Sequence, residues 1–263
     1  MGRSLAIALL LVGCGGPLQA PEELDELSGF IFEHQADGSE ALMAGAMRNL
    51  EAAVTQLDLD GRRLDRSWTP DLMTEETLAG LETPDGADPA NAIVVGLVAR
   101  TSWEAALHAE LATLEDQSPA EPSAVEYTRT FLEPTEPDCF GLMVCPELLT
   151  VNDIVRETAI YNARFELWKG FRAIEVDGRD ALISRAWMEK SVVGEEGNMS
   201  VSQAYTIDVV MDTDDGPLRV QVLWSETDLG VAVSQDVVRA TMRNGIDGLF
   251  TRTDEAIEEL LVP

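Results

Sequence analysis

The sequence predicts an α+β fold: an antiparallel β-meander packed against a long C-terminal helix, with an N-terminal helical arm. The meander is indicated by runs of alternating apolar residues between Tyr161 and Trp224, separated by turn residues. The closing helix is indicated by apolar residues at helical spacing from Val238 to Leu261. Hydrophobic residues make up 45% of the 263-residue chain, which is enough to form a folded core.

The first 13 residues have the layout of an export signal. Arg3 gives a short positive segment, and an unbroken apolar run follows from Leu5 to Val12. A helix over this run would span about 12 Å, far short of a hydrocarbon core of about 30 Å. The run therefore predicts a signal peptide and not a transmembrane anchor.

The signal ends in Leu11-Val12-Gly13-Cys14, which resembles the lipobox of bacterial lipoproteins. The resemblance implies that residues 1–13 are cleaved and that Cys14 carries acyl chains such as palmitate. Each buried methylene contributes about 0.8 kcal/mol, so two or three chains hold a protein stably on a bilayer. Residues 14–22 would then be a lipid-anchored tether at the membrane of the bacterial cell envelope. Gly15, where an Asp would imply retention at the inner membrane, favours the outer membrane.

Residues 23–57 predict a helical arm of two helices. The first covers about 23–34, with Leu24, Leu27 and Ile31 on one face, and the second follows the N-cap Ser39. Residues 58–89 contain repeated Asp-Gly and Pro positions and predict a loop region. We expect this loop to separate the arm from an α+β domain over residues 90–263.

The start of that domain leaves one element open. The apolar run Ile93–Ala99 fits either a buried strand or a helix, because periodicity alone does not separate the two. A helix is expected from the N-cap Ser102 to about Glu115. Residues 117–124 and 133–146 are rich in Pro and Ser and predict loops.

Cys139 and Cys145 are predicted to form a structural disulfide. Export places them in an oxidising compartment, and they are the two cysteines left once Cys14 is acylated. The alternatives are free buried thiols, or a metal or redox site. The spacing is not that of a C-x-x-C redox centre, and zinc would need two further ligands in a chain with only His34 and His108.

At least four strands are predicted in the meander, the first two joined by the hairpin turn Asp177-Gly178. They cover Ala163–Val176, Ala181–Val193, Ser202–Met211 and Leu218–Trp224. In the third strand every second residue is apolar, so the sheet is expected to have one apolar face. The closing helix is expected to begin at Ser234, a good N-cap residue.

Charge is the strongest bias in the composition. Eighteen basic residues stand against 48 acidic ones, for a net charge of −30. Such a surface repels phosphate backbones and anionic lipid headgroups, which argues against nucleic-acid binding and leaves membrane attachment to the lipid anchor. The surplus either attracts cationic ligands or divalent ions, or simply solvates the surface, and we favour the second interpretation.

Catalytic and metal motifs are absent from the sequence. It contains no Gly-x-Ser-x-Gly, HExxH, Walker A or Gly-x-Gly-x-x-Gly, and we expect no cofactor or metal. His108 with Glu104 one turn earlier is a candidate metal or surface pair, and His34 is interpreted as a helix C-terminal cap. The segment Asp212–Gly216 looks like a calcium loop but lacks the Glu at its twelfth position, so a hairpin turn is favoured.

Strands followed by a C-terminal helix, over roughly residues 160–261, resemble the helix-grip arrangement of START-like lipid-binding domains. The resemblance implies a cavity between sheet and helix for an apolar ligand. Trp187 and Trp224 could line this cavity, or they belong to the packed core, which is the commoner role for such residues. Three functions follow as hypotheses. The favoured one is a non-enzymatic envelope lipoprotein that binds an apolar ligand or protein partner. The others are a structural or assembly accessory of the envelope, and a hydrolase or metal-dependent enzyme using His108 and carboxylates.

Overall fold

The computed structural model describes residues 18–57, 59, 63–157, 162–195 and 199–262, so the predicted signal peptide and Cys14 lie outside the described residues. The helices are α1 (Leu24–His34), α2 (Glu40–Thr55), α3 (Ala105–Ala112), α4 (Asp138–Gly141) and α5 (Gln235–Leu260), with short 3-10 turns η1 (Arg63–Arg66) and η2 (Pro89–Asn91). The strands are β1 (Ser67–Trp68), β2 (Ile93–Arg100), β3 (Ala124–Glu133), β4 (Glu147–Glu157), β5 (Asn162–Val176), β6 (Arg179–Trp187), β7 (Val192–Val193), β8 (Ser200–Met211) and β9 (Leu218–Asp228).

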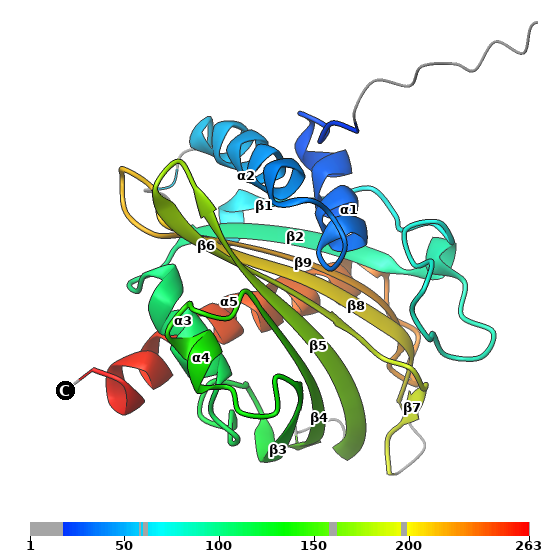
Figure 1. The fold of residues 1–263 in the computed structure, drawn as a ribbon. Helices are drawn as coiled ribbons and strands as arrows, with labels where there is room; N and C mark the ends of the chain where they lie inside the picture. The colour runs from blue at the N-terminus through cyan, green and yellow to red at the C-terminus, as the bar shows by residue number, and fades with distance from the viewer. Residues whose placement is uncertain (1–17, 58, 60–62, 158–161, 196–198, 263) are drawn as a thin grey trace, which may run out of the picture.

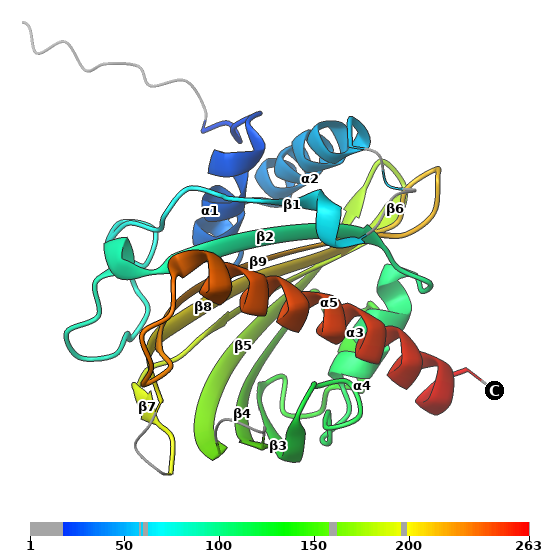
Figure 2. The same ribbon diagram turned by 180° about the vertical axis from the view of Figure 1, so that it is seen from behind.

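One antiparallel sheet holds all nine strands, in the order β1-β2-β9-β8-β6-β5-β4-β3, with β7 paired to β8 (Figures 1 and 2). Helices α1 and α2 cover one face of the sheet, and α5 crosses the other face with α3 and α4 beside it. The predicted α+β class is confirmed, and the sheet with its long C-terminal helix fits a helix-grip arrangement. The ambiguous run at residues 93–99 is strand β2.

The four predicted meander strands are neighbours in the sheet as β5, β6, β8 and β9. The turn between β5 and β6 has positive φ at both Asp177 (54°) and Gly178 (79°), as a two-residue hairpin turn requires. The second strand is shorter than predicted, because β6 ends at Trp187 and the chain re-enters the sheet only at β7. Helix α5 follows Ser234, whose Oγ accepts a hydrogen bond from the Val237 amide.

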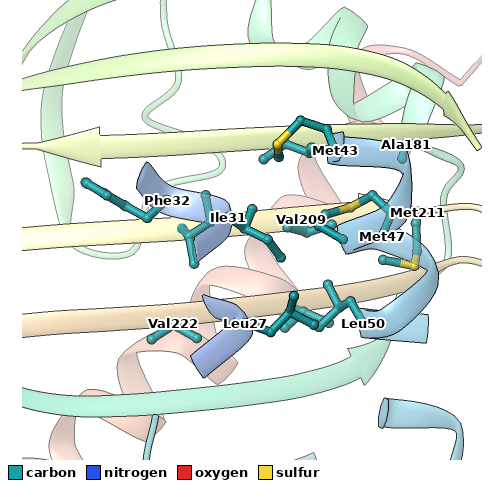
Figure 3. Packing of buried hydrophobic residues seen from close by; sticks show 14 of the residues in the cluster. Leu27, Ile31, Phe32, Met43, Met47, Leu50, Ala181, Val209, Met211 and Val222 are labelled. Atoms are coloured by element: carbon teal, nitrogen blue, oxygen red, sulfur yellow. The ribbon is translucent and has the colours of Figure 1, made fainter. Parts of the chain in front are cut away.

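The apolar face of the meander packs against the N-terminal helices (Figure 3). Leu27, Ile31 and Phe32 of α1 are fully buried against strand residues that include Val209 and Val222. The helical arm therefore lies directly on the sheet and shares its main core. The C-terminal helix covers the opposite, more polar face.

Hydrogen bonds from polar side chains hold the helical arm to the sheet and to the start of the described chain. Arg172 of β5 donates to the carbonyl oxygens of Gln35 and Gly38 at 3.1 and 2.7 Å, between the two helices. At the start of the described chain, the Asn49 amide donates to the carbonyl oxygens of Ala20 and Pro21 at 3.2 and 2.9 Å. In both contacts a side chain donates a hydrogen bond to backbone carbonyls that lie outside the helices and strands.

One expectation for the middle of the chain is wrong. The helix after Arg100 begins at Ala105 and ends at Ala112, and Glu104 rather than Ser102 is its N-cap. The Ser102 amide instead donates to Asp254 of α5 at 3.3 Å, so this residue holds the chain to the closing helix. Strands β3 and β4 also extend the sheet beyond the predicted meander.

Candidate ligand-binding cavity

A cavity of about 150 Å³ lies between the sheet and helices α3 and α5. Its apolar wall is made by Leu111, Ala112, Ala120, Leu167, Phe171, Leu182, Ala186, Val210 and Leu249. Its charged and polar wall is made by His108, Gln117, Glu121, Arg129, Arg156, Lys169, Ser184, Thr206, Asp208, Arg219, Gln221 and Thr253. The cavity is thus lined by apolar groups and by polar or charged groups in similar measure.

Strand register explains why polar groups meet here. Phe171 pairs with Ser184, Ser184 with Asp208, and Asp208 with Gln221, so these side chains form one row across four strands. Successive residues of a strand point to opposite faces. Thr206, Asp208 and Val210 of β8 and Arg219 and Gln221 of β9, which lie between the apolar positions of these strands, therefore line the cavity.

The best-buried ion pair in the cavity wall joins Arg219 of β9 to Asp208 of β8. The guanidinium contacts both carboxylate oxygens, with Nε to Oδ1 at 3.0 Å and Nη2 to Oδ2 at 2.6 Å. Its carbon lies 4.6 Å from the centre of the Phe250 ring on α5. Arg219 is 4% exposed, yet its Nη1 has no hydrogen-bond partner in the described part of the chain. Gln221 lies two residues further along the same strand. Its Oε1 is also buried and has no hydrogen-bond partner among the described residues.

A second charged group lies around Glu121. Its carboxylate accepts from Lys169 Nζ at 3.0 Å and from Arg156 Nη2 at 2.8 Å. Burial by itself would raise the pKa of Glu121, but the two cations outweigh it and lower the pKa to about 2. Burial opposes the charge on Lys169 too, and Glu121 overcomes this to raise the Lys169 pKa. The three side chains are therefore charged together at neutral pH.

Arg129 is held by neutral partners. Its Nε donates to Asn152 Oδ1 at 2.7 Å, Nη2 donates to the Tyr127 hydroxyl at 2.9 Å, and Nη1 donates to the Ala112 carbonyl. The guanidinium also lies 5.5 Å from the centre of the Phe171 ring. With 4% exposure, Arg129 is a buried cation whose bonds within the described residues all go to uncharged groups.

These contacts leave the cavity wall with an excess of positive charge. It contains four cationic side chains, from Arg129, Arg156, Lys169 and Arg219, and two carboxylates, from Glu121 and Asp208. The local excess of two positive charges is the reverse of the chain as a whole, with its net charge of −30.

His108 lies in the cavity wall and is 6% exposed. Its Nε2 is 3.4 Å from Thr101 Oγ1, which donates to Asp254 of α5. Burial, and secondly the charge of Arg219, lower the pKa of His108 well below its usual value, so it is neutral. The suggested surface pairing of His108 with Glu104 is wrong, because the His108 ring faces the interior and contacts Thr101.

Trp187 and Trp224 lie in the packed core on the other face of the sheet, which is the alternative that the sequence favoured. Trp224 is fully buried beside Phe32 of α1, with ring centres 6.1 Å apart, and its Nε1 donates to the Asp71 carbonyl. Trp187 stacks on Trp168 at 5.9 Å. They do not line the cavity because they share the face of the apolar positions, whereas α5 covers the alternate face.

The structure also shows where the other candidate residues from the sequence lie. Cys139 and Cys145 form a disulfide with an S–S distance of 2.04 Å. His34 is the last residue of α1. Residues 212–217 connect β8 to β9 as a turn. Among the residues that the structure describes, no group of three or more His, Cys, Asp or Glu side chains could hold a metal ion, and no helix has the length and apolar character to cross a bilayer.

A second hollow of about 360 Å³ lies beside β5 and the segment after α4. Its lining includes Val144, which is 74% exposed, and the exposed side chains of Glu40, Glu147 and Glu175. Exposed groups keep their hydration and contribute little directed binding energy. The cavity under α5, with its buried and oriented charges, is therefore the better candidate site.

Comparison with known proteins finds similarity at the level of structure alone. No protein-family model and no curated protein matches the chain. Among solved structures, TTHA0849 from Thermus thermophilus matches with 11% identity over 63% of this chain and 97% of that one, at a TM-score of 0.38. Ara h 8.0201 matches with 9% identity over 64% and 99% of the two chains, at 0.35. The human StarD13 (DLC2) lipid transfer and protein localization domain matches with 9% identity over 67% and 81%, at 0.41.

Proposed function

We propose that this chain is a lipid-anchored protein of the bacterial cell envelope that binds a small molecule in the cavity under α5, without catalysing a reaction. The observation that carries the binding proposal is a cavity with apolar side chains on one part of its wall and oriented, buried polar groups on the other. Ligand sites typically combine these two features, because apolar contact supplies affinity and a few polar groups fix orientation.

The size of the cavity limits the ligand. An apolar protein cavity of about 150 Å³ takes up a molecule as large as benzene, and this cavity has about that volume. A single ring or a short acyl chain with one polar group fits, whereas a sterol or a diacyl lipid does not. The apolar ligand expected from the sequence is thereby narrowed to a small amphipathic molecule.

The pairing of the charged groups supports binding rather than catalysis. Both cavity carboxylates are held by cations, Asp208 by Arg219 and Glu121 by Lys169 and Arg156. A general base needs a carboxylate that can take up a proton near neutral pH. The low pKa of Glu121 works against that role.

The binding proposal is tested with single-ring compounds. The Cys14→Ala variant, which keeps the rest of the chain, is titrated with benzyl alcohol, benzamide and benzoate while backbone amide NMR signals are followed. We expect shifts confined to residues around the cavity. Ala186→Leu, which fills part of the cavity, should weaken binding at least tenfold, whereas Ala52→Leu at an exposed position of α2 should leave it unchanged. Binding that survives Ala186→Leu, or absence of binding by all three compounds, would reject the proposal.

The anchor proposal has its own test. Cys14→Ala should release the protein from the membrane fraction into the soluble fraction of the cell envelope, because no other segment in the sequence favours an anionic bilayer. Acyl chains on Cys14 of the native protein would be detected by mass spectrometry. A Cys14→Ala variant that still sediments with membranes would show that Cys14 is not the sole anchor.

A further inference from the structure

We propose that the ligand of this cavity is an organic anion, a carboxylate carried on one ring or a short acyl chain, and that Arg219 recognises its charged group. This inference rests on the proposed binding function and adds the chemical class of the ligand. The first argument is the charge of the wall, where four cations face two carboxylates. A neutral or cationic ligand would leave that excess uncompensated in a poorly solvated space.

The second argument is an unused donor. The Nε and Nη2 atoms of Arg219 are bonded to Asp208, while Nη1 has no hydrogen-bond partner in the described part of the chain although it is buried. A buried donor without a partner is costly, and donors within a purely structural ion pair are normally all satisfied. An anionic oxygen is the strongest acceptor for a guanidinium N–H. The free Nη1 therefore favours an acceptor that the ligand supplies.

The surroundings of Arg219 fit the rest of such a molecule. Gln221 Oε1, without a partner among the described residues, gives a second polar atom on the same strand that suits a hydroxyl or protonated group. Val210 pairs with Arg219 across the sheet and Leu182 pairs with Val210, so an apolar row leads away from the guanidinium. A ligand with its carboxylate at Arg219 can thus place its apolar part along Val210 and Leu182.

The net charge of −30 repels an anion that approaches the protein from solvent, but it does not determine the affinity of the cavity for that anion. Exposed charges are screened beyond about 8 Å at physiological ionic strength. Arg219 is 4% exposed, so its contact with a bound carboxylate is much less screened. The surface charge therefore slows entry of an anion, while the cavity wall sets the affinity.

Three ligands of nearly equal size and different charge test the inference without any change to the cavity. Benzoate, benzamide and benzylamine are titrated into the Cys14→Ala variant by calorimetry. We expect benzoate to bind at least tenfold tighter than benzamide, and benzylamine, which is protonated at neutral pH, to bind weakest. If benzamide or benzylamine binds as well as benzoate, the anion inference is overturned and the proposed binding function stands. If none of the three binds, the proposed function itself fails.

A double variant then tests the role of Arg219. Arg219→Gln with Asp208→Asn removes the ion pair together, so that no buried charge is left alone and the charge of the cavity wall is unchanged. Benzoate affinity should fall at least tenfold, while benzamide affinity should change less than threefold. Equal loss for both ligands would assign Arg219 a structural role, and no loss for either would place the ligand elsewhere. The single variant Asp208→Asn, which adds one positive charge, should instead tighten benzoate binding, and weaker binding would contradict the inference.

Discussion

The buried carboxylate of Glu121 gives the sharpest stability prediction. A glutamate with a pKa of about 2 in the folded chain and an ordinary value of 4.5 contributes about 3 kcal/mol to the stability at neutral pH. Because folding lowers this pKa, the contribution is fully present above pH 4.5 and is lost as the pH falls toward 2. Glu121→Gln removes the charge while keeping the size of the side chain. It should therefore lower the free energy of unfolding by about 3 kcal/mol at about pH 7 and by only about 1 kcal/mol at about pH 3.

Urea unfolding of the native chain and the variant at both pH values measures this difference. The matched control is Glu126→Gln, which changes an exposed glutamate on neighbouring strand β3 and should stay within about 0.5 kcal/mol at either pH. The reasoning is refuted if Glu121→Gln costs the same in acid as at neutral pH. It is also refuted if the cost at neutral pH is no larger than that of the control, because Lys169 and Arg156 would then not hold the carboxylate as described.

Three further changes test the packing of the fold. Phe32→Ala removes a fully buried ring between α1 and the sheet and should cost about 3–5 kcal/mol, measured by urea unfolding; a cost below about 1 kcal/mol would show that the arm is loosely attached. Gly96→Ala would place a Cβ 2.5 Å from the Trp68 ring, so the melting temperature should fall by several degrees, and an unchanged value would contradict the close contact. Replacing Cys139 and Cys145 together by Ala should cost about 2 kcal/mol, and native protein treated with a reductant should match the variant.

The alternation of apolar residues was enough to predict the meander, because a sheet with one buried face has a clear period of two. The same alternation misled the prediction of the cavity. Ile207 and Val209 lie on the buried face of β8. The alternation therefore places Asp208, which lies between them, and Gln221, which pairs with Asp208 on β9, on the face expected to be exposed to solvent. In the structure these polar positions face the interior, because α5 closes over them. A polar strand face that is later covered by a helix has no distinct signal in a local sequence pattern.

The other features that the sequence did not predict also depend on contacts between residues far apart in the chain. Glu121 lies in a segment predicted to be a loop, and its partners Lys169 and Arg156 follow 48 and 35 residues later. Strands β3 and β4 do not show a clean apolar alternation, because their buried positions include Arg129 and Asn152. Only the tertiary contacts give these polar residues a place in the interior. Disulfide pairing was accessible from the sequence because two nearby cysteines and an oxidising compartment leave few alternatives.

The contact between Asn49 and the carbonyls of Ala20 and Pro21 sets how the molecule would be presented at a membrane. With Ala20 held against α2, five residues separate Cys14 from Ala20, and a fully extended chain over these six steps reaches about 20 Å. On the proposed anchor, the layer of α1 and α2 would therefore be oriented toward the bilayer. Helix α5 and the cavity beneath it lie on the opposite side of the sheet, so they would point away from the lipid, where a dissolved ligand arrives without crossing the headgroups.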